Sequence, residues 1–254
     1  MNKLKKTNTL FHSIREYESL KNIIKQKGFK ASYANEVIGE FNVKILMVSF
    51  SNVALFESKS QIDYGDFSIG LTKQWGMKNN LQPVVYTYEE SELGISFMEI
   101  IIITGRSVVR MQSDSPLKND LVKILDDNIN IIQYLKNVMV KNKLGTEFSA
   151  FNDREWRFVH KHGNCNSLIW EKNFLDNTDF EEYKSPKLNE KPYTNEVVLN
   201  FELSDVKYII VEENSQKREI FDLLSSSYGK NNVLDAIVNG DLDIISQNSL
   251  WDNL

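Results

Sequence analysis

The sequence has little cysteine, proline or histidine: its 254 residues include one cysteine, four prolines and three histidines. The single cysteine, Cys165, cannot form a disulfide within the chain, which favours a reducing compartment. Cys165 follows His160 and His162, but the spacing does not require a Cys–His nucleophile, so we interpret the thiol as a bystander. The two histidines have no evident third ligand, and no metal site is predicted.

Long apolar runs are absent as well. The most apolar run, Ile100–Ile103, is far too short to span a bilayer, which takes about 20 residues. The basic start of the chain, Met1–Lys6, is not followed by an apolar segment, so no signal peptide is predicted. We therefore expect a cytoplasmic protein that has no membrane partner.

The charge balance is acidic, with a net charge of -5 and a pI of about 5.4. Phosphate contacts need a concentrated basic surface, so nucleic acid is not expected as a general partner. A local basic groove stays open, and a DNA-binding autorepressor is the least favoured function. P-loop, dinucleotide-binding, HExxH and CxxC patterns are all missing, so no generic motif assigns a cofactor.

The chain contains 41% hydrophobic and 26% charged residues, which are ordinary values for a globular protein with a core of normal size. Hydrophobic periodicity predicts strands at 9–12, 44–50, 67–71, 84–88, 155–160, 197–203 and 206–212. It predicts helices at 16–27, 72–77, 92–109, 117–143, 216–226 and 233–245, and a short one from Asn52 toward Ile62. Thr72 is the expected N-cap of the helix at 72–77.

Strands and helices are mixed without regular alternation. This order favours a single α+β domain over residues 1–254, built on a mixed or antiparallel split sheet with flanking helices. The helices at about 92–145 are interpreted as an insertion packed against that sheet. The polar, acidic and aromatic stretch at about 173–192 is predicted to be a long surface loop.

Two predicted strand ends carry side chains that suit a nucleotide. His12 and Ser13 could donate to the amide or the ribose of a nucleotide, or Ser13 could simply cap the helix that follows. Ser49 and Phe50 place a hydroxyl and an aromatic ring at another strand end. That ring could stack on a nicotinamide or a base, although core packing is the commoner use.

Alternating charges mark a third segment, Asp153–Arg157. Alternation along a strand puts Asp153, Glu155 and Arg157 on one face and Arg154 and Trp156 on the other. A glutamate held by an arginine could accept a ribose 2′-hydroxyl and stabilise an oxocarbenium-like cation. A structural ion pair around a packed tryptophan is equally favoured.

Glycines and aromatic residues alternate between Tyr64 and Tyr86. The pattern predicts a strand, a short helix and a second strand. Gly65 and Gly70 either let a ligand approach the backbone or permit a tight sheet, and the second use is favoured. Trp75 is interpreted as a core residue.

Taken together, these segments resemble the AbiGi family of abortive-infection (phage resistance) proteins. The resemblance covers nearly the whole chain and is carried by Phe11-His12, Gly28, Met47–Phe50, Tyr64-Gly65, Gly70-Leu71, Trp75-Gly76, Pro83–Tyr86, Arg154–Arg157 and Leu203–Val211. It implies an antitoxin-like partner of a nucleotidyltransferase-type toxin in a two-gene phage-defence system. This resemblance does not identify a reaction.

The layout is also similar, more weakly, to that of ADP-ribosyltransferase-like proteins. This second resemblance implies that His12 and Ser13 contact NAD and that Glu155 is the catalytic carboxylate. The sequence departs from the usual pattern, because Ser13 stands where threonine is common and Asp153-Arg154 precedes Glu155 in place of Gln-x or Glu-x.

Two hypotheses follow for the function. In the first, the chain is an AbiGi-type interaction protein with a cognate toxin as its partner and no cofactor. In the second, it is an NAD-dependent ADP-ribosyltransferase or NAD hydrolase, in which His12, Ser13, Ser49, Phe50 and Glu155 surround one pocket. The sequence leaves the oligomeric state open.

Overall fold

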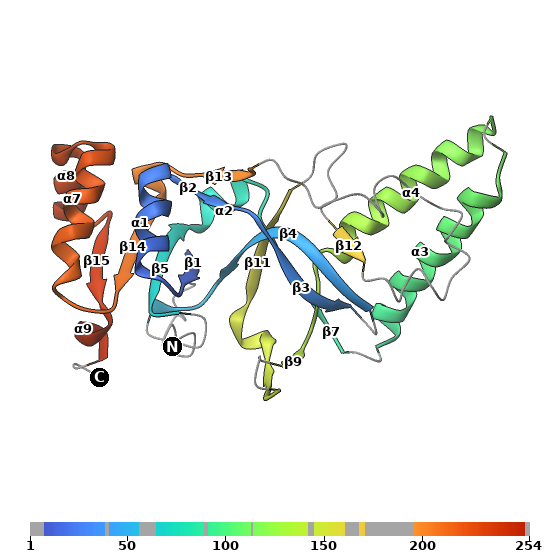
Figure 1. The fold of residues 1–254 in the computed structure, drawn as a ribbon, viewed down its shortest axis with the longest axis horizontal. Coiled ribbons are helices and arrows are strands. Elements are labelled where there is room, and N and C mark those ends of the chain that lie inside the picture. The colour runs from blue at the N-terminus through green and yellow to red at the C-terminus, as the bar shows by residue number, and fades with distance from the viewer. Residues whose placement is uncertain are drawn as a thin grey trace, which may run out of the picture.

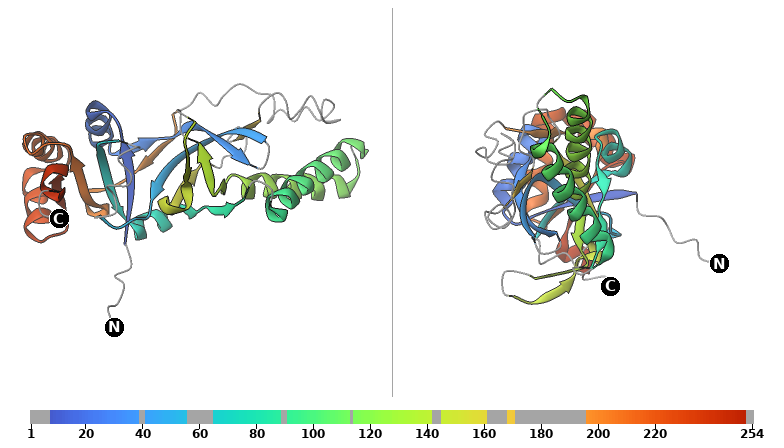
Figure 2. Two further views of the ribbon diagram at one scale, coloured as in Figure 1. Left: turned by 90° about the horizontal axis from the view of Figure 1, so that it is seen from below. Right: turned by 90° about the vertical axis from the view of Figure 1, so that its right-hand side faces the viewer.

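The computed structural model describes residues 8–38, 41–55, 65–88, 91–112, 114–141, 145–160, 168–170 and 196–251. The described chain has an α+β fold, in which a mixed nine-stranded sheet forms the centre of an elongated molecule (Figure 1). A pair of helices extends from one end, and further helices cover the other end (Figure 2). None of the described helices combines the length and the apolar character needed to cross a membrane.

The strands of the nine-stranded sheet are β1 (Thr9–Ile14), β3 (Ser32–Ile38), β4 (Phe41–Ser51), β5 (Phe67–Thr72), β6 (Gln82–Pro83), β11 (Glu155–Val159), β12 (Leu168–Trp170), β14 (Val206–Val211) and β15 (Asp243–Ser246). Shorter strands form three separate pairs: β2 (Gly28–Lys30) with β13 (Val198–Asn200), β7 (Val85–Thr87) with β8 (Leu135–Asn137), and β9 (Met139–Lys141) with β10 (Glu147–Ser149). The helices are α1 (Tyr17–Gln26), α2 (Lys73–Lys78), α3 (Glu92–Arg110), α4 (Pro116–Ile132), α7 (Gln216–Tyr228), α8 (Lys230–Val238) and α9 (Gln247–Trp251).

The long strand β4 is where the sheet divides. Its first part pairs with β3, ending at Met47 opposite Ser32, and its last residue, Ser51, pairs with Phe11 of β1. Between those two points this edge of β4 has no strand partner among the described residues, while the other edge pairs with β11. A gap in the ladder therefore lies between β1 and β3, which leave the same edge of β4.

The described residues form three hydrophobic clusters, of which the smallest contains Phe11, Val53 and Ile210 and the other two are the main cores. The larger contains Leu10, Ile69, Ile209 and Leu224, and joins the sheet to α1, α2, α7 and α8. The second contains residues of β3, β4, α3 and α4, among them Ile45, Met98 and Leu125. Buried residues of α3 and α4 thus pack against the sheet. That residues 92–145 are an insertion stays a prediction.

Several predicted elements are confirmed. Strands are observed where they were predicted at 9–12, 44–50, 67–71, 155–160 and 206–212. Helices are observed where they were predicted at 16–27, 72–77, 92–109 and 216–226. The hydroxyl of Thr72 caps α2 as expected, accepting a hydrogen bond from the Trp75 backbone N–H at 3.2 Å. Trp75 itself is buried in the larger core, also as expected.

Other predictions are wrong. The helix expected over 117–143 ends at Ile132, because Leu135 and Asn137 point inward from β8, which pairs with β7, and this alternation suits a strand. The helix expected over 233–245 ends at Val238, and Gly240 with a φ of 73° follows as its stop. The strand expected at 84–88 is present as β7 at 85–87, with the separate short strand β6 before it, whereas the strand expected at 197–203 is reduced to β13.

Residues 28–38, to which the sequence analysis assigned no element, form β2 and β3. The predicted helix from Asn52 toward Ile62 lies mostly outside the described residues, as does the predicted surface loop at 173–192.

The glycines in the segment around β5 permit close packing of the chain. A Cβ on Gly65, whose φ is 147°, would lie 2.2 Å from the backbone oxygen of Ile14. A Cβ on Gly70 would lie 2.7 Å from the ring of Phe11 in the neighbouring strand. These contacts favour the tight-sheet interpretation of both residues over a ligand-approach role.

Gly65→Ala is expected to lower the free energy of unfolding by about 3–4 kcal/mol, because the added methyl group meets a rigid carbonyl at an unfavourable φ. Gly240→Ala is the matched control. Its φ is also positive, at 73°, but nothing lies within 4 Å of the added Cβ, and we expect a loss of only about 1–2 kcal/mol. Urea unfolding of both variants measures the difference, and equal losses would contradict the close packing at Gly65.

Candidate functional site

A cavity of about 250 Å³ opens where the sheet divides. Its described walls come from both sides of the gap: β1 and β3 leave β4 there, and β8 and β11 close the far side. The lining residues are Phe11, His12, Ser13, Ala34, Glu36, Met47, Ser49, Phe50, Ser51, Lys136, Asp153 and Glu155.

All five residues that the sequence nominated line this one cavity. His12 and Ser13 come from β1, Ser49 and Phe50 from β4, and Glu155 from β11. Pairing of β11 with β4 sets Glu155 opposite Ser51, and the antiparallel contact of β1 with β4 sets Phe11 opposite the same residue. The register of three strands therefore brings the candidates together.

The side chain of His12 bridges the gap in the sheet. Its Nδ1 lies 2.8 Å from the backbone oxygen of Ser49, a carbonyl on the edge where β4 has no described strand partner. A carbonyl can only accept, so Nδ1 carries the proton and Nε2 is an acceptor. The ring lies against Phe29 and Phe50, at centroid distances of 4.9 Å and 5.5 Å.

Burial lowers the pKa of His12, and the hydrogen bond to Ser49 offsets this only in part. The imidazole is therefore neutral near pH 7. A neutral ring with one free lone pair can accept a hydrogen bond from a hydroxyl, but it contributes no charge to the cavity.

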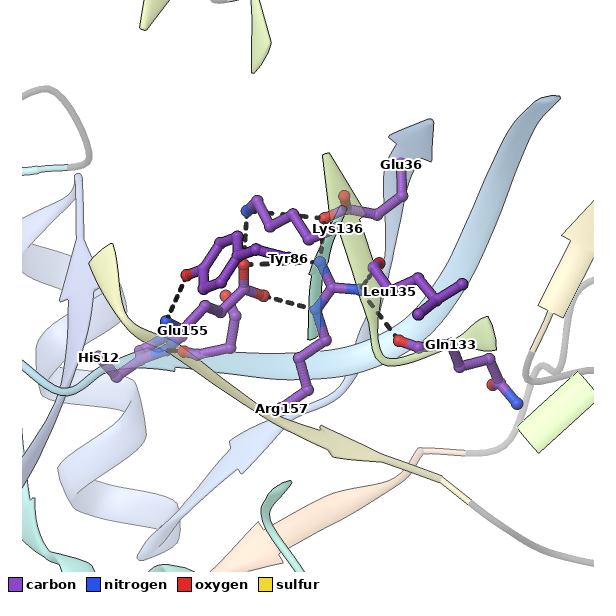
Figure 3. A network of polar contacts seen from close by, with 9 residues as sticks. His12, Glu36, Tyr86, Gln133, Leu135, Lys136, Glu155 and Arg157 are labelled. Carbon is purple, nitrogen blue, oxygen red and sulfur yellow. Dashed lines mark hydrogen bonds and ion pairs between the residues drawn. The ribbon is translucent and has the colours of Figure 1, made fainter. Parts of the chain in front are cut away.

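Glu155 belongs to a buried network of two carboxylates and two cations (Figure 3). Its Oε1 lies 2.6 Å from Arg157 Nε, and its Oε2 lies 2.5 Å from Lys136 Nζ and 3.5 Å from Arg157 Nη2. Glu36 of β3 pairs with Arg157 Nη2 at 2.8 Å and with Lys136 at 4.0 Å. The network thus ties β3, β8 and β11 together beneath the cavity.

Arg157 is fully buried and also donates from Nη1 to the backbone oxygens of Gln133 and Leu135, at 2.9 Å and 3.3 Å. Burial alone would lower the pKa of the guanidinium, but the charges of Glu155 and Glu36 raise it above the ordinary value. Arg157 is consequently a permanent cation that the fold holds in one orientation.

The carboxyl of Glu155 stays ionised because two cations lie beside it. Burial by itself would raise its pKa, but Arg157 and Lys136 together outweigh burial and lower it. An ionised carboxylate offers about four acceptor positions, of which the described contacts occupy three. One position is left for a group in the cavity that Glu155 lines.

Sequence reasoning missed two members of this network. Lys136 was placed inside a predicted helix, and Glu36 lay in a segment without a predicted element. Both pair with residues distant in sequence, so only tertiary structure brings the four charges together. The alternation at Glu155, Trp156 and Arg157 was visible in the sequence, and the structure confirms that Trp156 lies on the opposite face, packed against the larger core.

Of the other candidate residues, His160 is buried just after β11 and is not among the described residues that line the cavity. His162 and Cys165 lie outside the described residues.

Comparison with known proteins supports one family. Residues 13–212 match the family described as abortive phage resistance protein AbiGi, antitoxin. The chain is also similar to the abortive phage resistance protein AbiGi of Lactococcus lactis subsp. cremoris, at 25% identity over 176 residues, which cover 66% of this chain and 69% of that protein. No solved structure matches. The ADP-ribosyltransferase-like layout therefore has no structural relative to support it.

The neutral state of His12 predicts a pH dependence. Its pKa in the folded protein lies below the ordinary value of 6.5, so unfolding takes up a proton as the pH falls below 6.5. The stabilising contribution is complete above that pH and is lost as the pH falls toward the folded pKa. Between pH 7.5 and 5.5 the wild type should lose about 1 kcal/mol more unfolding free energy than His12→Gln, which keeps a donor for Ser49. Equal losses in urea titrations would contradict a neutral, buried imidazole.

Proposed function

We propose that this chain, which belongs to the AbiGi family of abortive phage resistance proteins, uses NAD in the cavity at the gap in the sheet. The reaction is transfer of ADP-ribose to an acceptor, or to water in the case of NAD hydrolysis. One observation carries the proposal: His12, Ser13, Ser49, Phe50 and Glu155 line a single cavity although they come from three strands. A layout like that of ADP-ribosyltransferases is part of the proposal.

The cavity suits the ribose and nicotinamide end of NAD. Glu155 keeps one acceptor position for a ribose hydroxyl, and His12 Nε2 offers a second acceptor. Glu36 and Glu155 carry two negative charges, against two positive charges on Lys136 and Arg157. The carboxylate of Glu155, which lines the cavity, favours the cation that develops on the ribose.

The proposed step breaks the bond between the ribose C1′ and the nicotinamide nitrogen. The bonding electrons leave with nicotinamide, which becomes neutral, and the ribose becomes oxocarbenium-like. A hydroxyl of the acceptor, or water, then forms the new bond to C1′, and its proton passes to solvent water. Glu155 stabilises the cation through the ribose hydroxyl, and Arg157 and Lys136 hold its carboxylate in place.

The first test is nicotinamide release from labelled NAD, measured with and without a phage-infected lysate. Glu155→Gln should lower the rate at least roughly a hundredfold, because it removes the charge that stabilises the cation. Asp222→Asn is the matched control, since Asp222 is exposed on α7, pairs with Arg218 and lines neither this cavity nor the one beside α1. Its rate should equal that of the wild type.

Loss of one partner from a buried ion pair costs about 3–5 kcal/mol, so Glu155→Gln needs an unfolding curve beside the rate. Ser49→Tyr provides a second variant that fills the cavity and leaves the four charges paired. Its binding of NAD, measured by calorimetry, should be lost. A folded wild type that neither binds nor cleaves NAD under any of these conditions would overturn the proposal.

A second candidate function is that of an antitoxin-like partner of a nucleotidyltransferase-type toxin. The observation that favours it is the number of exposed apolar side chains on the α3–α4 pair, which extends from one end of the molecule (Figure 2). The exposed residues are Leu93, Ile95, Ile100 and Ile103 of α3 and Leu117, Ile124 and Ile131 of α4. Exposed apolar side chains gathered on one pair of helices are typical of protein interfaces.

This function predicts that Ile103→Lys with Leu117→Lys abolishes co-purification with the cognate toxin, because two charges enter an apolar interface. These side chains are 61% and 53% exposed, so the fold should tolerate the change. Val238→Lys, at a 75% exposed position on α8, is the control and should leave binding intact. Co-purification that survives the double substitution would exclude this surface as the toxin site.

A further inference from the structure

A second cavity, of about 480 Å³, adjoins the first and shares His12 with it. It lies between α1 and the short strand β2. The described lining residues are His12, Ser19, Asn22, Ile23, Lys25, Gln26, Phe29 and Lys30.

The wall contributed by α1 comes from the solvent-facing side of this amphipathic helix, whose core side carries Leu20 and Ile24. Ser19, Asn22 and Gln26 lie on this exposed side and end in a hydroxyl or an amide. Gln26 already donates to the backbone oxygen of Gly28 at 2.9 Å. The hydroxyl of Ser19 and the amide of Asn22 can donate hydrogen bonds to the oxygens of a ligand.

The two cavities differ in charge. The second is lined by Lys25 and Lys30 and by no acidic residue among the described ones, which gives two positive charges. The carbonyls of Ile23 and Ile24 at the end of α1 accept from the Lys27 backbone N–H, which satisfies part of the negative helix end. Lys30 also pairs with Glu196 at 2.6 Å, and both side chains are more than half exposed, so this pair is weak.

The volumes of the two cavities also indicate that a long ligand would extend into the second one. Ligand sites usually measure about 300–1,000 Å³. The first cavity, at about 250 Å³, falls below that range, while the second lies within it. A ligand as long as a dinucleotide therefore cannot be held in the first cavity alone, and the space next to it is the cavity on the other side of His12.

We propose that the cavity between α1 and β2 is a subsite for the diphosphate of a nucleotide, contacted by Lys25, Lys30 and the polar face of α1. One ligand then spans both cavities, with its cationic end against Glu155 and its anionic middle against the lysines. His12 lies between them as a neutral acceptor for a ribose hydroxyl. The identity of the ligand as NAD rests on the proposed function, whereas the diphosphate subsite does not.

The test is calorimetric titration of the full chain with ADP, which carries the diphosphate but has no nicotinamide and cannot be turned over. Lys25→Gln with Lys30→Gln should raise the Kd for ADP at least roughly tenfold, because charge-assisted contacts to phosphate are lost. The affinity of the wild type should also fall as salt is raised. Lys78→Gln, at an exposed position on α2, is the matched control and should leave the Kd unchanged.

Glu196→Gln is expected to change the affinity for ADP in the opposite direction. It removes the carboxylate that pairs with Lys30, so ADP should bind more tightly than to the wild type. ADP binding that is absent, or that ignores both the lysine and the Glu196 substitutions, would overturn the subsite.

The two proposals fail separately. Lysine-dependent ADP binding without any cleavage of NAD would support the subsite and reject the NAD reaction. NAD cleavage whose KM is unchanged in the lysine variant would support the reaction and reject the subsite.

Discussion

The interruption of hydrogen bonding along one edge of β4 is the constraint on which the rest of the site depends. Because β1 and β3 leave that edge at different points, the ladder has a gap. Backbone groups of β4 in the gap have no strand partner among the described residues, so side chains must form their hydrogen bonds. The imidazole of His12 donates to the Ser49 carbonyl there. The same gap creates the cavity, so His12, which bonds to the unpaired edge of β4, also lines the site.

The buried charges beneath the cavity serve the fold and the chemistry together. Arg157 and Lys136 neutralise Glu155 and Glu36, and they join β3, β8 and β11 beneath the cavity. Buried pairs add little net stability over apolar packing but are costly to break. An interpretation as a structural ion pair and one as a catalytic carboxylate therefore do not exclude each other.

The sequence predicted most of the strands of the sheet, and the five residues it nominated all line the cavity. Local patterns carry that information. Alternation at Glu155–Arg157 and the residues next to His12 and Ser49 are short-range signals. Glu36 and Lys136 gave no such signal, since their partners are distant in the chain. The end of α4 at Ile132 was missed because pairing of β8 with β7 overrides the helical pattern that runs through Leu135.

We propose that the cavity at the gap holds the ribose next to Glu155. A crystal structure of the wild type with carba-NAD, whose glycosidic bond resists cleavage, would show the position of the ribose. We expect a ribose hydroxyl within hydrogen-bonding distance of a Glu155 oxygen, with Arg157 and Lys136 still paired to that carboxylate. A ligand bound elsewhere, or a cavity that stays empty at saturating ligand, would contradict it.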